Sequence, residues 1–178
     1  MRIISGKYRG KKINPPNNLP VRPTTDYAKE ALFNCLANKI DFEDIKVLDL
    51  FCGTGNITFE FASRGVEDLT CVEINFKCAE FIKRTVLELK AKGIKVITSD
   101  VYKFISYSSD KYDLIFADPP YDMQETLFLA DRIFEKQLLN KNGYLVIEHP
   151  EDKDFSNNHF FEERRKYGKV NFSFFHNK

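Results

Sequence analysis

The stretch VLDLFCGTG at residues 47–55 indicates the fold class. A short apolar strand at 45–50 runs into a turn that contains Gly53 and Gly55, and a helix is expected at 57–64. Glycine lacks a Cβ, so the backbone can approach a ligand closely at this turn. Asp49 precedes the first glycine by four residues. Ligands of open α/β sheets bind at the carboxyl ends of the strands, which makes this turn a candidate cofactor site.

Outward from this turn, apolar strands alternate with amphipathic helices. Strands are expected at 69–74, 95–98, 112–117 and 144–148, and helices at 76–92, 101–107 and 123–139. Such alternation predicts a parallel sheet with helices on both faces. A final antiparallel pair is expected at 160–166 and 169–176, with its turn at Gly168. By analogy, this ending favours the Rossmann-like class I methyltransferase fold, an α/β fold with a mostly parallel seven-stranded sheet.

The N-terminal part differs from the rest in charge and in proline content. We predict a β-ribbon at 2–13 and a linker at 14–23, so that residues 1–23 precede a methyltransferase domain at 24–178 within one globular unit. Thr24 or Thr25 is expected to cap the first helix. A basic surface is typical of a partner that is a polyanion, although an ordinary solvated surface is the alternative. The residues predicted to bind nucleic acid here are Arg2, Lys7, Tyr8, Arg9, Lys11, Lys12 and Arg22.

Acidic residues end two further strands. Glu73 lies 20 residues after Gly53, where a carboxylate can accept hydrogen bonds from ribose hydroxyls. Asp100 can accept from an adenine amino group while Val101 packs on the ring, and a helix N-cap is the competing role for Asp100. These residues complete the predicted cofactor site with Asp49 and the two glycines. The cofactor motifs alone fit either NAD or S-adenosylmethionine.

The sequence ADPPY at residues 117–121 favours S-adenosylmethionine. Two prolines after a strand make a stiff, non-helical loop. In that loop, Asp118 and the carbonyl of Pro119 are preorganised acceptors that suit the two N–H groups of an amine. The ring of Tyr121 offers a face on which a base can stack, and Pro120 is placed with the substrate contacts. The pattern indicates methyl transfer to an exocyclic amine of a base, a reaction that requires no metal.

These motifs together resemble those of the RsmD-type 16S rRNA guanine-N2 methyltransferases. The resemblance covers residues 3–150. It rests on ISGKYRG at 4–10, RPTTD at 22–26 before EALFN at 30–34, LDLF at 48–51 with the two glycines, Glu60 with SRG at 63–65, and DPPY at 118–121. Asn75, Ala28 and the Phe-rich tail after residue 150 depart from the family pattern.

The resemblance implies methyl transfer from S-adenosylmethionine to the N2 amine of a guanine in 16S rRNA, within small-subunit particles, with S-adenosylhomocysteine as the product. It implies that the base is held by Asp118 and Tyr121. A nucleic-acid adenine-N6 methyltransferase uses the same tetrapeptide, and a non-catalytic RNA-binding or assembly protein that retains the fold is a further alternative. An NAD(P) oxidoreductase has no use for the DPPY loop.

Composition bounds the remaining expectations. The 178 residues carry a net charge of +1 and contain no apolar run near the roughly 18 residues of a membrane span, so we expect a cytoplasmic monomer. His149 receives no role. The cysteines lack metal-ligand spacing, and neither a metal site nor a disulfide is expected. They are Cys35, Cys52, Cys71 and Cys78.

Overall fold

The computed structural model describes residues 1–16, 19 and 25–178. They contain one seven-stranded sheet in the order β3-β2-β1-β4-β5-β7-β6. Strands β1 to β5 are parallel, and β7 is antiparallel to both β5 and β6. The predicted mostly parallel sheet with an antiparallel ending is confirmed. The strands are β1 Lys46–Leu50, β2 Asp68–Glu73, β3 Ile94–Thr98, β4 Tyr112–Ala117, β5 Leu139–His149, β6 Phe161–Tyr167 and β7 Val170–His176.

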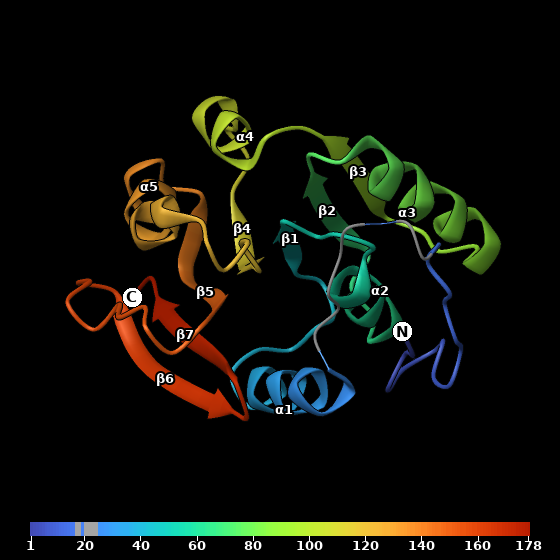
Figure 1. Ribbon diagram of the computed structural model, residues 1–178, viewed down its shortest axis with the longest axis horizontal. Coiled ribbons are helices and arrows are strands. Elements are labelled where there is room, and N and C mark those ends of the chain that lie inside the picture. Colours follow the sequence, from blue (N-terminus) through green and yellow to red (C-terminus); the bar gives the residue numbers. More distant parts are fainter. Residues whose placement is uncertain (17–18, 20–24) are drawn as a thin grey trace.

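Helices cover both faces of the sheet (Figure 1). The side chains of α1, α2 and α3 pack in one hydrophobic cluster with one face, and those of α4 and α5 pack in a second cluster with the other. Strand β1 serves both clusters because successive side chains point to opposite faces: Val47 lies in the first, and Leu48 in the second. The helical elements are α1 Asp26–Ala37, α2 Asn56–Ser63, α3 Phe76–Leu89, α4 Val101–Tyr107, the 3-10 turn η1 Gln124–Phe128 and α5 Leu129–Glu135.

Two helices are shorter than the sequence predicts. The expected helix at 123–139 is η1 followed by α5, because Leu139 already belongs to β5 and pairs with Tyr112. The expected end of α3 at Gly93 is wrong, since the helix ends at Leu89 and Lys90 takes the left-handed conformation. Gly93 serves a different purpose. A Cβ there would lie 1.6 Å from the carbonyl oxygen of Glu67, so only glycine allows the two segments to come so close.

Residues 1–16 form a compact loop in which the predicted short β-ribbon is limited to the pairing of its two ends. One antiparallel bridge joins Arg2 to Lys12, and the described part of the segment contains no strand. The chain turns at Gly6 with φ 81° and at Gly10 with φ 80°, and backbone hydrogen bonds pair residues 1–3 with residues 10–13 on either side of these turns. The buried Ile3 packs in the same cluster as α1 and α2. Arg22, Thr24 and most of the predicted linker lie outside the described residues, whereas Thr25 caps α1 as expected.

Candidate active site

The candidate residues Asp49, Glu73 and Asp118 meet at the carboxyl ends of three neighbouring strands. Leu50 of β1 is in register with Val72 of β2 on one side and with Ala117 of β4 on the other. The backbone N–H of Asp118 donates to the carbonyl of Leu50 at 3.3 Å. The edge of the sheet that was predicted to bind the cofactor and the base therefore brings these three acids together.

The glycine turn between β1 and α2 has the conformation that glycine allows. Gly53 and Gly55 have φ values of 55° and 81°. A Cβ on Gly55 would lie 2.8 Å from the ring of Phe59, so the turn excludes a larger residue on two grounds. Phe51 also has a positive φ, 59°, which is unusual for a bulky side chain. Strained backbone of this kind is concentrated at ligand sites.

Glu73 at the end of β2 is tied to this turn. Its side chain is 8% exposed, and its two carboxylate oxygens accept from the backbone N–H of Gly53 at 2.8 Å and of Asn75 at 2.7 Å. Burial raises the pKa of Glu73, and the two backbone N–H groups oppose that rise. Each oxygen retains a further lone pair, so the carboxylate can still accept from ribose hydroxyls.

Asp49 is buried, and only one of its two carboxylate oxygens has a hydrogen-bond partner among the described residues. Its Oδ2 accepts from the hydroxyl of Thr58 on α2, whereas Oδ1 has no hydrogen-bond partner among the described residues. Burial raises the pKa of Asp49 to about 7. A buried acceptor without a donor is rare in folded proteins and needs an explanation. The charged ammonium and sulfonium of S-adenosylmethionine fit this observation, because they bring positive charge and N–H donors to an acid-lined edge.

The DPPY loop holds a second acid. Asp118 is half-buried, and its pKa is well above the usual range because of burial first, then the nearby carboxylates of Glu148 and Asp49. Pro119 is buried and Pro120 exposed. The hydroxyl of Tyr121, which is 43% exposed, lies 3.3 Å from Oε1 of Glu148 and donates to it.

The sequence reasoning missed Glu148. It is 3% exposed at the end of β5, in the position after Ile147, which is in register with Ala117. The sequence feature that could have identified Glu148 is its position at the end of a predicted strand, which it shares with Glu73 and Asp118. It could be used only once β4 and β5 were known to be neighbours.

Asp100 and Val101 have structural roles. Oδ1 of Asp100 accepts from the backbone N–H of Lys103 at 2.8 Å and so caps α4. The N-cap alternative is therefore confirmed. Val101 is buried in the second cluster. Contact of these two residues with an adenine ring stays a prediction.

Comparison with known proteins assigns the family. The family model described as Conserved hypothetical protein 95 matches residues 1–176. The chain belongs to the Cons_hypoth95 family. The ribosomal RNA small subunit methyltransferase D of Buchnera aphidicola (subsp. Baizongia pistaciae) is 30% identical over 184 residues, which cover 99% of this chain and 92% of that protein. The Escherichia coli (strain K12) protein of the same name is 32% identical over 151 residues, 83% and 71% of the two chains.

A solved structure agrees with this assignment. The structure described as "Putative methyltransferase yhhF from Escherichia coli" superposes with a TM-score of 0.86 at 25% identity, and the match covers 100% of this chain and 98% of that one. The fold is therefore the class I S-adenosylmethionine-dependent methyltransferase fold. Among residues 1–16, 19 and 25–178, no group of His, Cys, Asp or Glu side chains is placed to hold a metal ion. The described helices include none with the length and apolar character to cross a bilayer.

Glu60 of this Cons_hypoth95 protein belongs to a buried ionic network that sequence reasoning did not foresee. Glu60 is 0% exposed and Lys29 is 1% exposed, with 3.5 Å between Lys29 Nζ and Glu60 Oε2. Burial lowers the pKa of Lys29, and Glu60 opposes that effect. Nζ of Lys29 also donates to the carbonyl of Arg2 at 2.7 Å. The family resemblance included Glu60 in one of its motifs, but an acidic residue in a short helix is usually exposed, so its burial was not predicted.

The same network fastens the N-terminal loop to α2. Glu60 accepts from the backbone N–H groups of Ile4 at 2.8 Å and Ser5 at 3.1 Å. Farther along α2, the carbonyl of Ser63 accepts from the N–H of Lys7 at 2.7 Å. A Cβ on Gly6 would lie 1.8 Å from that carbonyl oxygen, so the loop and the helix are in close backbone contact. The loop therefore has a fixed position on α2.

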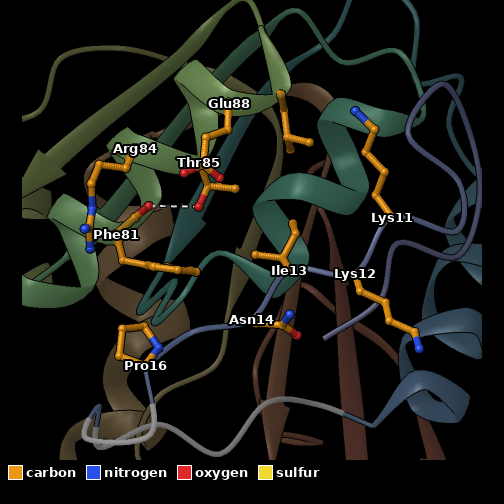
Figure 2. Close-up of a pocket in the computed structure, with 10 residues that line it drawn as sticks. Lys11, Lys12, Ile13, Asn14, Pro16, Phe81, Arg84, Thr85 and Glu88 are labelled. Carbon is orange, nitrogen blue, oxygen red and sulfur yellow. Dashed lines mark hydrogen bonds between the residues drawn. The ribbon is translucent and has the colours of Figure 1, made fainter.

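The predicted basic residues remain largely available to a partner. The side chains of Lys7 and Lys11 lie over the ring of Tyr8, at 5.2 and 5.5 Å from its centre, and Arg2 pairs with Asp26 at 3.2 Å. Lys11 and Lys12 form one side of a groove of about 470 Å³ whose other side is α3 (Figure 2). The α3 side of the groove adds a further cation and an acid. The residues of α3 that line it are Phe81, Arg84, Thr85, Glu88 and Leu89.

Proposed function

We propose that this Cons_hypoth95 protein transfers a methyl group from S-adenosylmethionine to the N2 amine of a guanine in 16S rRNA of the small ribosomal subunit. The observation that carries the proposal is the pair of acids at neighbouring strand ends: Asp49 with an unpartnered buried oxygen beside the glycine turn, and Asp118 in the rigid DPPY loop. One acid suits the cationic cofactor and the other suits the amine that receives the methyl group.

Methyl transfer from S-adenosylmethionine depends on the orientation of the amine more than on covalent catalysis by the protein. When bound, S-adenosylmethionine supplies a strongly electrophilic methyl group. An aryl amine is a weak nucleophile because its lone pair is delocalised into the ring. Asp118 and the carbonyl of Pro119 accept its two N–H groups, favour a pyramidal nitrogen and direct the lone pair at the methyl group. Tyr121 stacks on the base, which must be splayed out of its RNA to reach the loop.

The choice of rRNA is supported by relatives named as small-subunit ribosomal RNA methyltransferases, and the choice of guanine N2 by the motif resemblance. The direct test incubates the protein and S-adenosylmethionine with small-subunit particles from a strain that lacks this enzyme. The rRNA is then digested to nucleosides and separated. We expect N2-methylguanosine as the product. N6-methyladenosine in its place would support the adenine alternative, and no methylation would support a non-catalytic RNA-binding role.

Replacement of Glu73 by Ala should weaken S-adenosylmethionine binding by about 1–3 kcal/mol, the scale of hydrogen bonds to a charged group. Isothermal titration calorimetry gives the affinity. Glu67→Ala, which removes an exposed acid just before the start of the same strand, should leave this affinity unchanged. Because Glu73 also holds Gly53 and Asn75, a thermal melt of each variant accompanies the titration. An unchanged affinity in a folded Glu73→Ala variant would remove Glu73 from the site.

Neutralisation of four cations of the N-terminal loop should weaken RNA binding and flatten its salt dependence. Each lost phosphate contact should reduce the salt slope by about 0.7–0.9, because fewer counterions are released. The substitutions to Gln are at Lys7, Arg9, Lys11 and Lys12. Binding to 16S rRNA fragments is measured over a range of salt concentrations, and cofactor affinity should not change.

A control with the same loss of charge separates contact from net charge. It replaces four exposed lysines that lie outside the N-terminal loop, and it should keep the wild-type salt slope. These lysines are Lys95, Lys111, Lys141 and Lys178. Equal slopes for the two quadruple variants would mean that the loop is an ordinary solvated surface.

A further inference from the structure

Glu148 lies beside Asp118 on the same face of the sheet. Ala117 and Ile147 are in register at the ends of the parallel strands β4 and β5, so the next residue on each strand points to the opposite face from that pair. Those next residues are Asp118 and Glu148. The influence of Glu148 on the pKa of Asp118 agrees with this closeness. Two carboxyl groups from adjacent strands therefore occupy one side of the proposed base site.

Tyr121 connects Glu148 to the substrate loop. Its hydroxyl donates to Oε1 of Glu148 at 3.3 Å. Tyr121 is 43% exposed whereas Glu148 is 3% exposed, so a buried carboxyl group lies at the hydroxyl end of the aromatic residue that is proposed to stack on the base. A polar group placed in this way can contact the edge of a base that lies against Tyr121.

Two adjacent acceptors match guanine better than adenine. The edge of guanine presents N1–H and the N2 amine side by side, and both are donors. Adenine presents an amine beside N1, which is an acceptor. A carboxylate opposite that nitrogen would lose its hydrogen bond and be repelled by the lone pair. A site built to hydrogen-bond one group strongly rejects the analogue that lacks it, because the buried polar group is left unpaired.

We infer that Glu148 is a specificity-determining residue that accepts the N1–H of the target guanine while Asp118 accepts from its amine. The inference rests on the proposed function and deepens it. Flipped bases are read along this edge in other enzymes that act on bases. In this Cons_hypoth95 protein the two strand ends supply one acceptor for each guanine donor, so the choice of base is made by the catalytic domain.

Three nucleosides separate the two contacts. Guanosine has both donors, inosine keeps N1–H but lacks the amine, and 2,6-diaminopurine riboside keeps the amine but lacks N1–H. Binding of each is measured by NMR titration of the protein saturated with S-adenosylhomocysteine, so the experiment does not depend on turnover. The wild-type protein should prefer guanosine to each analogue by about tenfold or more, the scale of one hydrogen bond to a charged group.

The variants should lose one preference each. Glu148→Gln should bind guanosine and the diaminopurine riboside equally, because its amide can accept from N1–H or donate to N1, while it keeps the preference over inosine. Asp118→Ala should lose the preference over inosine and keep the other. Tyr121→Phe, which retains the stacking ring and both carboxyl groups, should keep both preferences. S-adenosylhomocysteine affinity serves as the check that each variant is folded.

Several results would overturn the inference. They are equal binding of the three nucleosides by the wild-type protein, binding of none of them, or an equal loss for all three in Glu148→Gln, which would mean that Glu148 only supports Tyr121. The proposed function fails on a different measurement, the absence of N2-methylguanosine in treated particles. A guanosine preference that depends on Glu148 would remain interpretable in that case.

Discussion

Replacement of Asp118 by Ala is expected to reduce methyl transfer by about 100- to 1000-fold, the usual cost of removing one preorganised contact to a transition state. Asp118 supplies the carboxylate of the rigid loop, and neither proline has a polar side chain that could replace it, so the Pro119 carbonyl is the acceptor that remains in the loop. The rate is measured by transfer of labelled methyl groups to small-subunit particles under single-turnover conditions.

The affinity for S-adenosylmethionine should be nearly unchanged in Asp118→Ala. The cofactor contacts are predicted at the glycine turn and at Glu73, on other strands. Asp122→Ala is the matched control, since Asp122 is an exposed acid four residues farther along the same loop, and it should keep most of the activity. Near-normal turnover in Asp118→Ala would rule out the proposed role of the carboxylate.

Replacement of Glu60 by Ala is expected to lower the free energy of unfolding by about 3–5 kcal/mol, because it leaves the buried charge of Lys29 with only neutral acceptors, the Arg2 carbonyl and Asn56 Oδ1, and removes the ion-pair partner of Arg64. It also removes the acceptor for the backbone N–H groups of Ile4 and Ser5. Urea denaturation followed by circular dichroism measures the loss. The surface pair of Glu80 and Lys83 provides the contrast, since Glu80→Ala should cost about 0–1 kcal/mol.

A compensating variant tests the mechanism of that loss. Lys29→Met combined with Glu60→Leu removes both buried charges and should recover part of the stability, as replacement of buried ion pairs by apolar residues often does. The backbone N–H groups of Ile4 and Ser5 would still lack their acceptor, so recovery should be incomplete. A loss below about 1 kcal/mol in Glu60→Ala would mean that water compensates Lys29, contrary to its near-complete burial.

The sheet was predictable because its information is local. Strands β1 to β4 are short, mostly apolar runs between turn residues, and the alternation with helices restricts the topology to few choices. The glycine turn and the DPPY loop were predictable for a related reason, since Gly53, Gly55 and the two prolines fix the backbone by their own covalent structure. Asp49, Glu73 and Asp118 could then be placed together by the rule that parallel strands end at one edge.

The missed features depend on contacts between distant residues. Glu60 lies in a short helix, and its buried partners, Lys29 and the backbone of Ile4 and Ser5, are distant in the sequence. Glu148 lies near Asp118 because of the register between β4 and β5, and the pattern of residues within a strand does not determine that register. The basic N-terminal loop was expected as a short ribbon, and its two ends pair in that way. The sequence did not indicate that Ile3 is buried in one cluster with side chains of α1 and α2.

The acid-lined edge also has a consequence for turnover. In the proposed reaction the sulfur of the cofactor is positively charged before transfer and neutral afterwards. Asp49, the acid assigned to the cofactor, attracts the first form electrostatically, and that attraction disappears in the same step that methylates the base. The edge therefore retains the reactant and has a weaker hold on the spent cofactor. Discharge of the sulfonium would in this way assist product release, and the enzyme would be freed for another ribosomal particle without any movement of its fold.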